Sequence, residues 1–221
     1  MIRAIDLSRT YNSGLHPVRA LRGVTLEVAE GDFVAIAGPS GCGKTTFLNL
    51  VGGLDQPCSG HILLDGLDLG GLSASALCRL RREKLGFVFQ SYNLIPVLTA
   101  RENVEFGLIV RGTDPCLVAK LAREALERVG LLEMCDRRPT ELSGGQQQRV
   151  AVARAIGGNP RLVIADEPTA NLDSTTAQDL VDLLEKLNVE YGVTFLFSSH
   201  DPLVLSRARR VVRFRDGQIQ I

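Results

Sequence analysis

The feature of this 221-residue sequence that most constrains its fold is the run Gly38-Pro39-Ser40-Gly41-Cys42-Gly43-Lys44-Thr45. It fits the pattern G-x4-G-K-[ST] and follows the apolar segment Phe33–Ala37, which predicts a buried β-strand. A helix is expected to begin near Lys44. Glycines let such a loop curl tightly enough to aim several backbone N–H groups at one point, where the helix N-terminus adds about half a positive charge. This run, called the phosphate loop below, therefore predicts a phosphate-binding turn between a strand and a helix.

The side chains of the phosphate loop supply further chemistry. Lys44 is expected to reach the β- and γ-phosphates of a nucleotide, and the Thr45 hydroxyl to bind Mg²⁺. The alternative, a glycine-rich turn with an accidental lysine, is disfavoured because the pattern also has the flanking strand and helix that it requires. Cys42 has two interpretations: a thiol near a helix N-terminus is a candidate for oxidation or alkylation, and a small side chain can simply fill space.

A second apolar strand, Leu162–Ala165, is followed by two carboxylates, Asp166 and Glu167. Successive side chains of a strand point in opposite directions, so the two acids should have different roles. Asp166 is placed to hold Mg²⁺ through water, and Glu167 to orient and deprotonate an attacking water. A strand that merely ends in acidic turn residues is the alternative, which the phosphate loop in the same chain disfavours.

Ser143, Gly144 and Gly145 stand at the start of a helix that is expected to run to about Ile156. They make a second exposed helix N-terminus that can bind an anion. Taken alone, the pattern is explained equally well as a helix cap. In a chain with a phosphate loop, it indicates that a γ-phosphate is bound between two opposed helix ends, one of them supplied by a second copy of the chain.

Hydrophobic periodicity predicts an α/β fold with a mostly parallel sheet and an N-terminal antiparallel β region. Strands are expected at Ile2–Leu7, Val24–Val28, Phe33–Ala37, His61–Leu64, Leu162–Ala165 and Val193–Phe197, and at Val211–Arg215 and Gln218–Ile221 around an Asp216-Gly217 type I′ turn. The residues Asn12-Ser13-Gly14 and Pro17 predict a polar loop after the first strand.

The middle of the chain, residues 91–160, is predicted to be an inserted helical subdomain of a single domain, with residues 1–90 and 161–221 as its core. Helices are expected from the Thr99–Glu102 capping box to Arg111, at Cys116–Val129 after Asp114-Pro115, from Ser143 to Ile156, from Asp173 to Val189, and after Asp201-Pro202. The apolar face of the second of these helices is expected to comprise Leu117, Leu121, Ala125 and Val129.

Composition argues against some classes of function, although a local basic patch stays possible. Lys plus Arg and Asp plus Glu each number 25, and this zero net charge argues against a nucleic-acid binder. Aromatic residues make up 5% and Trp is absent, which leaves little for a base-stacking platform. The five cysteines form no CxxC pair, as expected for reduced thiols rather than disulfides or zinc ligands. A charged N-terminus and the lack of a long apolar run predict neither a signal peptide nor a membrane span.

Seven motifs in order resemble those of the ATP-binding domains of ABC transporters, and the resemblance covers nearly all of residues 1–221. The motifs are Tyr11, the phosphate loop, Gln90, the signature segment Leu142–Gln148, the Asp166-Glu167 pair, the D-loop Thr169–Asp173 and His200. The resemblance implies a P-loop NTPase core, hydrolysis of ATP to ADP and phosphate with Mg²⁺, and a head-to-tail homodimer. Two ATP molecules would lie between the phosphate loop of one subunit and the signature segment of the other.

The resemblance also assigns individual roles. Tyr11 would stack on adenine, contributing roughly 1–3 kcal/mol, unless it is a core or hairpin tyrosine. Gln90 would contact Mg²⁺ and the attacking water, although alone it is an ordinary polar residue at a strand end. His200 would contact the γ-phosphate and Glu167, although a lone histidine is usually structural. Asp173 would both cap a helix and contact the partner subunit. The remaining implied nucleotide contacts are Gly38, Ser40, Gly41, Cys42, Gly43, Thr46, Gly144, Gly145 and Gln146.

Three segments resemble the lipoprotein-releasing and macrolide-exporter group within this family: Leu48–Asp55, Gly86–Val104 and the three glutamines that end the signature segment. That group implies a separate integral-membrane permease with a large extracytoplasmic region, and a location on the cytoplasmic face of the inner or plasma membrane. Gly107, where the group often has proline, and the Arg209-Arg210 pair depart from its pattern, so partner and substrate stay open.

Three other functions compete with transport. An ABC ATPase that drives envelope or cell-division signalling would use the same fold. A stand-alone translation or repair ATPase would usually need tandem domains or a long coiled coil, and the sequence predicts neither. A non-enzymatic nucleotide-binding regulator is disfavoured by the presence of Glu167 and His200.

Overall fold

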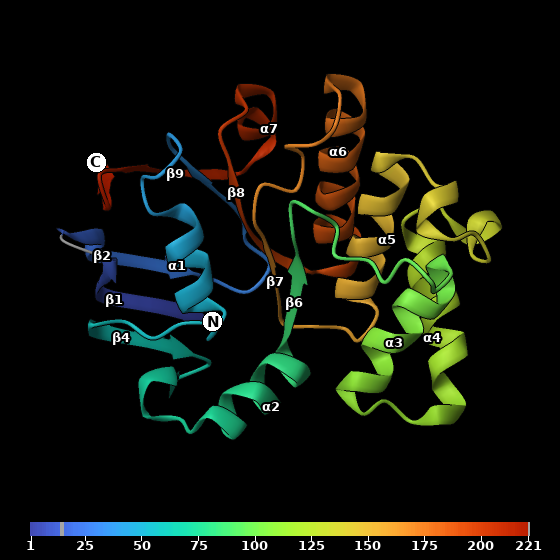
Figure 1. Ribbon diagram of the computed structural model, residues 1–221, viewed down its shortest axis with the longest axis horizontal. Coiled ribbons are helices and arrows are strands. Elements are labelled where there is room, and N and C mark those ends of the chain that lie inside the picture. The colour runs from blue at the N-terminus through green and yellow to red at the C-terminus, as the bar shows by residue number, and fades with distance from the viewer. Residues whose placement is uncertain (14–15, 221) are drawn as a thin grey trace.

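The computed structural model describes residues 1–13 and 16–220, which form two sheets and seven α-helices within those ranges (Figure 1). The larger sheet has the order β10-β9-β3-β8-β7-β6, and its neighbours are parallel except for β10, which is antiparallel to β9. Its strands are β3 (Phe33–Ala37), β6 (Leu85–Val88), β7 (Leu162–Ala165), β8 (Thr194–Ser199), β9 (Arg210–Arg215) and β10 (Gln218–Gln220). The predicted α/β fold with a mostly parallel sheet is confirmed.

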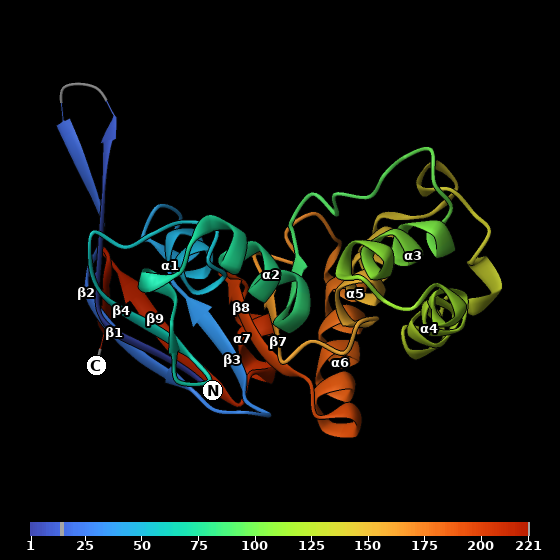
Figure 2. The same cartoon turned by 90° about the horizontal axis from the view of Figure 1, so that it is seen from below.

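The smaller sheet is antiparallel, with the order β2-β1-β4-β5, as predicted for the N-terminal region. It comprises β1 (Ile2–Ser13), β2 (His16–Val28), β4 (Ser59–Leu64) and β5 (Leu67–Asp68). The prediction of a polar loop at Asn12, Ser13 and Pro17 is wrong, since Asn12 pairs with Pro17 in a long hairpin of β1 and β2. Proline is tolerated there because β2 is an edge strand. Figure 2 shows this hairpin standing away from the body. Gly14, which belonged to the predicted loop, lies outside the described residues.

Except for the first, the α-helices of the described residues begin after a residue whose side chain caps them. They are α1 (Lys44–Val51), α2 (Ala74–Lys84), α3 (Ala100–Arg111), α4 (Pro115–Arg128), α5 (Gly144–Ile156), α6 (Ser174–Tyr191) and α7 (Pro202–Arg207), with 3-10 turns at Leu69–Gly71, Leu132–Met134 and Pro139–Glu141. Thr99 and Glu102 form the predicted capping box of α3, and Asp114 caps α4 with Pro115 in its first turn. Sequence reasoning missed α2, whose start is marked by the N-cap Ser73.

The predicted apolar face of α4 is displaced by one residue at its start. Ala125 and Val129 of the predicted face are buried as expected, whereas Leu117 is 47% exposed and the adjacent Val118 is buried. Leucine and valine at adjacent positions are both compatible with a buried face, and packing of α4 against α3 and α5 selects the second.

The larger sheet separates two hydrophobic cores. Phe33 and Ala35 face the core shared with α3, α4, α5 and α6, whereas Val34 and Ile36 face the core shared with α1 and the smaller sheet. The central strand β3 is therefore apolar on both sides, as expected for a parallel strand that is covered on both faces. This arrangement fixes the carboxyl ends of β3, β7 and β8, where an open α/β sheet binds its ligands.

No helix within residues 1–13 and 16–220 is both long and apolar enough to cross a membrane.

Candidate functional site

The phosphate loop connects β3 to α1 as predicted. Gly38 and Gly43 both have positive φ angles, 155° and 105°. A Cβ atom at Gly38 would collide with the carbonyl oxygen of Phe214, and one at Gly43 with the carbonyl oxygen of Ala20. Gly43 is the N-cap of α1, and no side chain of the described residues caps this helix. The N–H groups of the first turn are therefore left for a ligand.

A cavity of about 820 Å³ lies in front of the phosphate loop, within the size range of small-molecule sites. Nine of the predicted site residues line it: Tyr11, Ser40, Gly41, Gly43, Lys44, Thr45, Thr46, Gln90 and Glu167. The chain thus brings together residues that are up to 156 positions apart.

Sequence reasoning missed the other wall of this cavity. Arg19 and Arg22 of β2 line it, together with Asp216 and Gly217 of the β9–β10 turn. The Arg22 N–H donates to the Gly217 carbonyl oxygen (2.8 Å), which joins the two segments. The type I′ geometry predicted for this turn agrees with the positive φ angles of Asp216 and Gly217.

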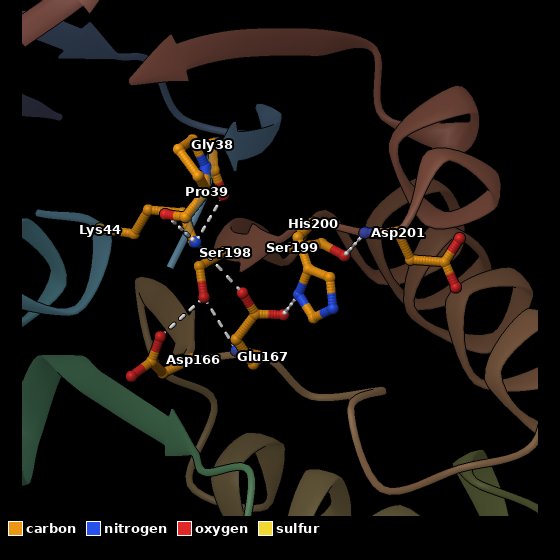
Figure 3. Close-up of polar contacts among 9 residues, drawn as sticks. All are labelled: Gly38, Pro39, Lys44, Asp166, Glu167, Ser198, Ser199, His200 and Asp201. Atoms are coloured by element: carbon orange, nitrogen blue, oxygen red, sulfur yellow. Dashed lines mark hydrogen bonds and ion pairs between the residues drawn. The ribbon is translucent and has the colours of Figure 1, made fainter. Parts of the chain in front are cut away.

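Lys44 is 7% exposed and lies across the loop (Figure 3). Its Nζ donates to the carbonyl oxygens of Gly38 (2.7 Å) and Pro39 (3.3 Å) and lies 3.4 Å from Glu167 Oε1. The ammonium group is thus held at the end of β3 beside the phosphate loop, where its charge faces the acidic end of β7.

The two acids after β7 point to different partners, but alternation along a strand is not the reason: the strand ends at Ala165, and Glu167 has a φ angle of 46°. Asp166 Oδ1 accepts a hydrogen bond from Ser198 Oγ (2.7 Å). Glu167 approaches Lys44 with one carboxylate oxygen, and its other oxygen lies 3.0 Å from His200 Nδ1. Figure 3 shows Glu167 between these two basic groups. His200 is largely exposed, with 62% of its side chain accessible, and it lines a neighbouring cavity together with Gly38.

Tyr11 lines the cavity from β1 and is held by two residues that sequence reasoning missed. Its hydroxyl donates to Asp55 Oδ2 (2.7 Å), and the Arg9 guanidinium lies 4.8 Å from the ring centroid. Arg9 in turn donates to Asp55 Oδ1 (2.8 Å). No local pattern connects Asp55 with β1, since their contact depends on the fold.

Gln90 lines the cavity beyond the end of β6. Its backbone carbonyl accepts from the Asn171 side chain (3.0 Å), which ties it to the loop before α6.

Among the described residues, the signature segment and Asp173 do not line this cavity. Ser143 caps α5: its hydroxyl accepts from the Gln146 N–H (3.3 Å), and Gln146 Oε1 accepts from the Ser143 N–H (2.9 Å). Gly145 packs so closely on α6 that a Cβ would collide with Thr176. Gly144 is close to the Tyr92 side chain. Ser143 itself is exposed.

Asp173 caps α6 at an exposed position. The Thr176 hydroxyl and the N–H of Thr176 donate to its carboxylate and hold the pKa of Asp173 below its usual range.

Cys42 is buried behind the phosphate loop and does not line the 820 Å³ cavity within the described chain. Its sulfur occupies the space beside Gly38, which agrees with the space-filling interpretation of this residue.

The fold and this cavity define a P-loop α/β protein with the architecture of ABC ATPase cassettes. Residues 21–170 match the family model described as "ABC transporter", so the chain belongs to the ABC transporter family.

Two curated relatives agree with the subgroup suggested by the sequence. The lipoprotein-releasing system ATP-binding protein LolD 1 of Rhodopseudomonas palustris is 48% identical over 222 residues, covering 99% of this chain and 98% of its own. The macrolide export ATP-binding/permease protein MacB of Syntrophobacter fumaroxidans is 47% identical over 222 residues and covers all of this chain. The chain spans 31% of that MacB protein.

Solved structures match the fold closely. The cassette MJ0796 of Methanocaldococcus jannaschii, an uncharacterised ABC transporter ATP-binding protein, is 43% identical, covering 100% of this chain and 95% of its own. Its dimeric post-hydrolysis structure with ADP and phosphate has a TM-score of 0.90 at 42% identity, covering 100% of this chain and 97% of that one.

Proposed function

We propose that this chain hydrolyses ATP and that its dimer drives a separate membrane protein. The observation that carries the proposal is the Glu167 carboxylate, held between Lys44 and His200 at the edge of a cavity that the phosphate loop lines. A carboxylate in that position can act as a general base, and an ammonium group beside it can bind phosphate.

The proposed roles follow from the positions of the side chains. On nucleotide binding, the Lys44 ammonium would exchange its contacts with loop carbonyls for the β- and γ-phosphates. Ser40, Gly41, Gly43 and Thr46 would contact phosphate from the loop and first turn. Glu167 would accept the proton of the attacking water, and His200 would hold Glu167 and contact the γ-phosphate. Tyr11 would stack on the adenine base.

The donor set near the loop fits Mg²⁺. Thr45 and Gln90, whose side chains carry a hydroxyl and an amide, line the cavity. Asp166 is not among the described residues that line it but directly follows β7, the strand that pairs with β6. Hydroxyl, amide and carboxylate oxygens are ligands that Mg²⁺ accepts, with water completing its octahedron. Bound there, Mg²⁺ would neutralise charge on the β- and γ-phosphates.

We further propose a head-to-tail homodimer in which Ser143, Gly144, Gly145, Gln146 and Asp173 of one subunit complete the site of the other. Their absence from the lining of the chain's own cavity and the exposure of Ser143 and Asp173 support this arrangement. The solved dimer of MJ0796 with ADP and phosphate is a precedent among the relatives. In this proposal residues 91–160 act as the helical subdomain that carries the signature segment.

The names of LolD and MacB favour lipoprotein release or export as the process driven by this chain. The membrane partner would place the chain at the cytoplasmic face of the inner or plasma membrane. An envelope or cell-division signalling ATPase is the competing function. Affinity purification of the tagged chain from its native membranes, followed by mass spectrometry, distinguishes them: a permease with a large extracytoplasmic region supports release or export, and a division protein contradicts it.

Replacing Glu167 by Gln tests the proposed chemistry. Loss of a general base lowers turnover by about 10²- to 10⁴-fold, while ATP binding is retained and a stable ATP-bound dimer accumulates. Phosphate release and size-exclusion chromatography with ATP measure the two effects.

Glu190→Gln is the matched control, because Glu190 is exposed at the far end of α6. It should behave as wild type. If Glu167→Gln hydrolyses ATP as fast as wild type, Glu167 is not the general base. If the wild-type protein itself does not hydrolyse ATP, the proposed function is refuted.

A further inference from the structure

Ser198 lies where two parallel strands end beside one another. In the sheet, Ala165 of β7 pairs with Phe197 of β8, so the residues that follow each of them, Asp166 and Ser198, are neighbours at the carboxyl edge. Ser198 is fully buried in β8, all of whose residues are buried. Its hydroxyl is therefore shielded from water and depends on partners within the protein.

The Ser198 hydroxyl contacts both acidic residues at once (Figure 3). Its Oγ donates to Asp166 Oδ1 (2.7 Å) and accepts from the backbone N–H of Glu167 (2.8 Å). An ionised carboxylate only accepts and an amide N–H only donates, so the direction of both bonds is fixed. A single hydroxyl thus sets the Asp166 side chain and the Glu167 backbone relative to each other.

The Glu167 backbone requires such support. Its φ angle is 46°, in the left-handed region that non-glycine residues seldom adopt. In this conformation the Glu167 side chain reaches both Lys44 and His200. The hydrogen bond from its N–H to Ser198 stabilises the conformation that makes these contacts.

We propose that Ser198 is a positioning residue for ATP hydrolysis. It orients the Asp166 carboxylate toward bound Mg²⁺ and the Glu167 carboxylate toward the attacking water, without contacting nucleotide itself. This inference rests on the proposed function, because it assumes the roles of Asp166 and Glu167.

Ser199 provides a matched control. It is the next residue of the same strand, is equally buried, and accepts a hydrogen bond through its hydroxyl, from the Asp201 N–H (3.1 Å). That bond leads to the start of α7 rather than to the two acids. Ser198→Ala and Ser199→Ala therefore each remove one buried hydroxyl, and only the first removes contacts to Asp166 and Glu167.

The test compares Ser198→Ala, Ser199→Ala and Ser198→Thr with wild type. For Ser198→Ala we expect kcat to fall about 10-fold, as for a lost hydrogen bond to a charged group, with KM for ATP changed less than 3-fold. The Mg²⁺ concentration for half-maximal turnover should rise several-fold. Ser198→Thr keeps the hydroxyl and should restore both values, and Ser199→Ala should match wild type.

Binding supplies a readout that does not need turnover. The affinity for a fluorescent ATP analogue is measured with Mg²⁺ and with EDTA. Ser198→Ala should lose affinity several-fold with Mg²⁺ and remain unchanged with EDTA, whereas general loosening would weaken both. Thermal unfolding of each variant shows whether it is folded. If Ser198→Ala is unfolded, Ser198→Thr is compared with wild type instead. The proposal then requires that Ser198→Thr depends on Mg²⁺ as wild type does.

Equal kcat, Mg²⁺ dependence and binding in Ser198→Ala and Ser199→Ala would overturn the positioning role while leaving the proposed function intact. Absence of turnover in wild type would instead refute the proposed function, and the metal-dependent binding would still decide whether Ser198 orients Asp166.

Discussion

The helices α1 and α5 both begin beside glycines but, in the part of the chain that the structure describes, only α5 has side chains that cap its first turn. No side chain of the described residues caps α1, whose N-cap is Gly43 in a left-handed conformation. Ser143 and Gln146 form a complete capping box at the start of α5. The start of α1 faces the 820 Å³ cavity of its own chain, and the exposed Ser143 does not.

This difference suggests different roles for the two first turns: that of α1 binds a ligand in its own chain, and that of α5 contacts another subunit. The uncapped N–H groups of α1 need an outside acceptor, so a phosphate group can take the place of the missing cap. In the first turn of α5, the Gln146 N–H already has a side-chain partner, the Ser143 hydroxyl. This turn is suited to being offered to another subunit, which agrees with the proposed dimer.

The largest expected effect in this comparison is on turnover, from a substitution at the start of α5. Ser143→Arg places a bulky cation at a helix N-terminus, where the helix dipole already repels it, and blocks the surface proposed to close on the partner's ATP. Turnover should fall by about 10²- to 10³-fold, as for removal of a donor that stabilises the transition state. ATP binding to the monomer should persist, as measured by equilibrium binding.

Ser143→Ala is its control, because it removes the same cap without adding bulk or charge. Because Ser143 is also proposed to contact the partner's ATP, turnover of Ser143→Ala should fall, but less than that of Ser143→Arg, and the variant should lose about 1 kcal/mol of unfolding free energy. Normal hydrolysis by Ser143→Arg would contradict the shared site.

A smaller effect is expected on the α1 side. Lys44→Ala removes the cation at the phosphate loop, so ATP affinity should fall roughly 10- to 100-fold, corresponding to about 1.5–3 kcal/mol for a hydrogen bond to a charged group. Unlike Ser143→Arg, it should weaken binding to the monomer. Lys186→Ala, at an exposed position on α6, is the control. Unchanged ATP affinity in Lys44→Ala would contradict the assignment of the phosphate loop.

The smallest expected effect is on the free energy of unfolding and concerns Asp173, the charged cap of α6, in contrast to Ser143, the neutral cap of α5. Hydrogen bonds from Thr176 lower the pKa of Asp173 from its usual 3.8, so the carboxylate stabilises the folded state above pH 4, and this contribution is lost as pH falls through the lowered pKa. Asp173→Asn removes the titrating group. The unfolding free energy of wild type minus that of Asp173→Asn should therefore shrink between pH 5 and about pH 3. A difference that is constant over this range, measured by urea unfolding, would contradict the charged cap.

Local sequence patterns predicted the elements that depend on neighbouring residues. Thr99 with Glu102, and Asp114 with Pro115, marked helix starts because a cap is made by residues within three positions. The phosphate loop was equally visible, since its strand, glycines, lysine and helix are contiguous. The roles assigned to individual site residues stay predictions until the variants are measured.

Other features escaped sequence reasoning because distant residues decide them. Pro17 indicated a loop, yet its place on an edge strand permits pairing with Asn12. Leu117 was predicted to lie in the core, but packing of α4 buries the adjacent Val118 instead. No pattern linked Arg19 or Asp55 to the site, because their nearness to the cavity and to Tyr11 comes from the pairing and packing of the N-terminal sheet.

The sequence by itself determined the phosphate loop, the buried strands, most helix starts and the family of the chain. These features arise from backbone geometry and hydrogen bonds over a few residues. Only the tertiary structure decided that Lys44, Glu167 and His200 meet, and that Ser198 joins Asp166 to Glu167. The physical reason is that the order of strands in the sheet, set by two hydrophobic cores, places their carboxyl ends side by side whatever their separation along the chain.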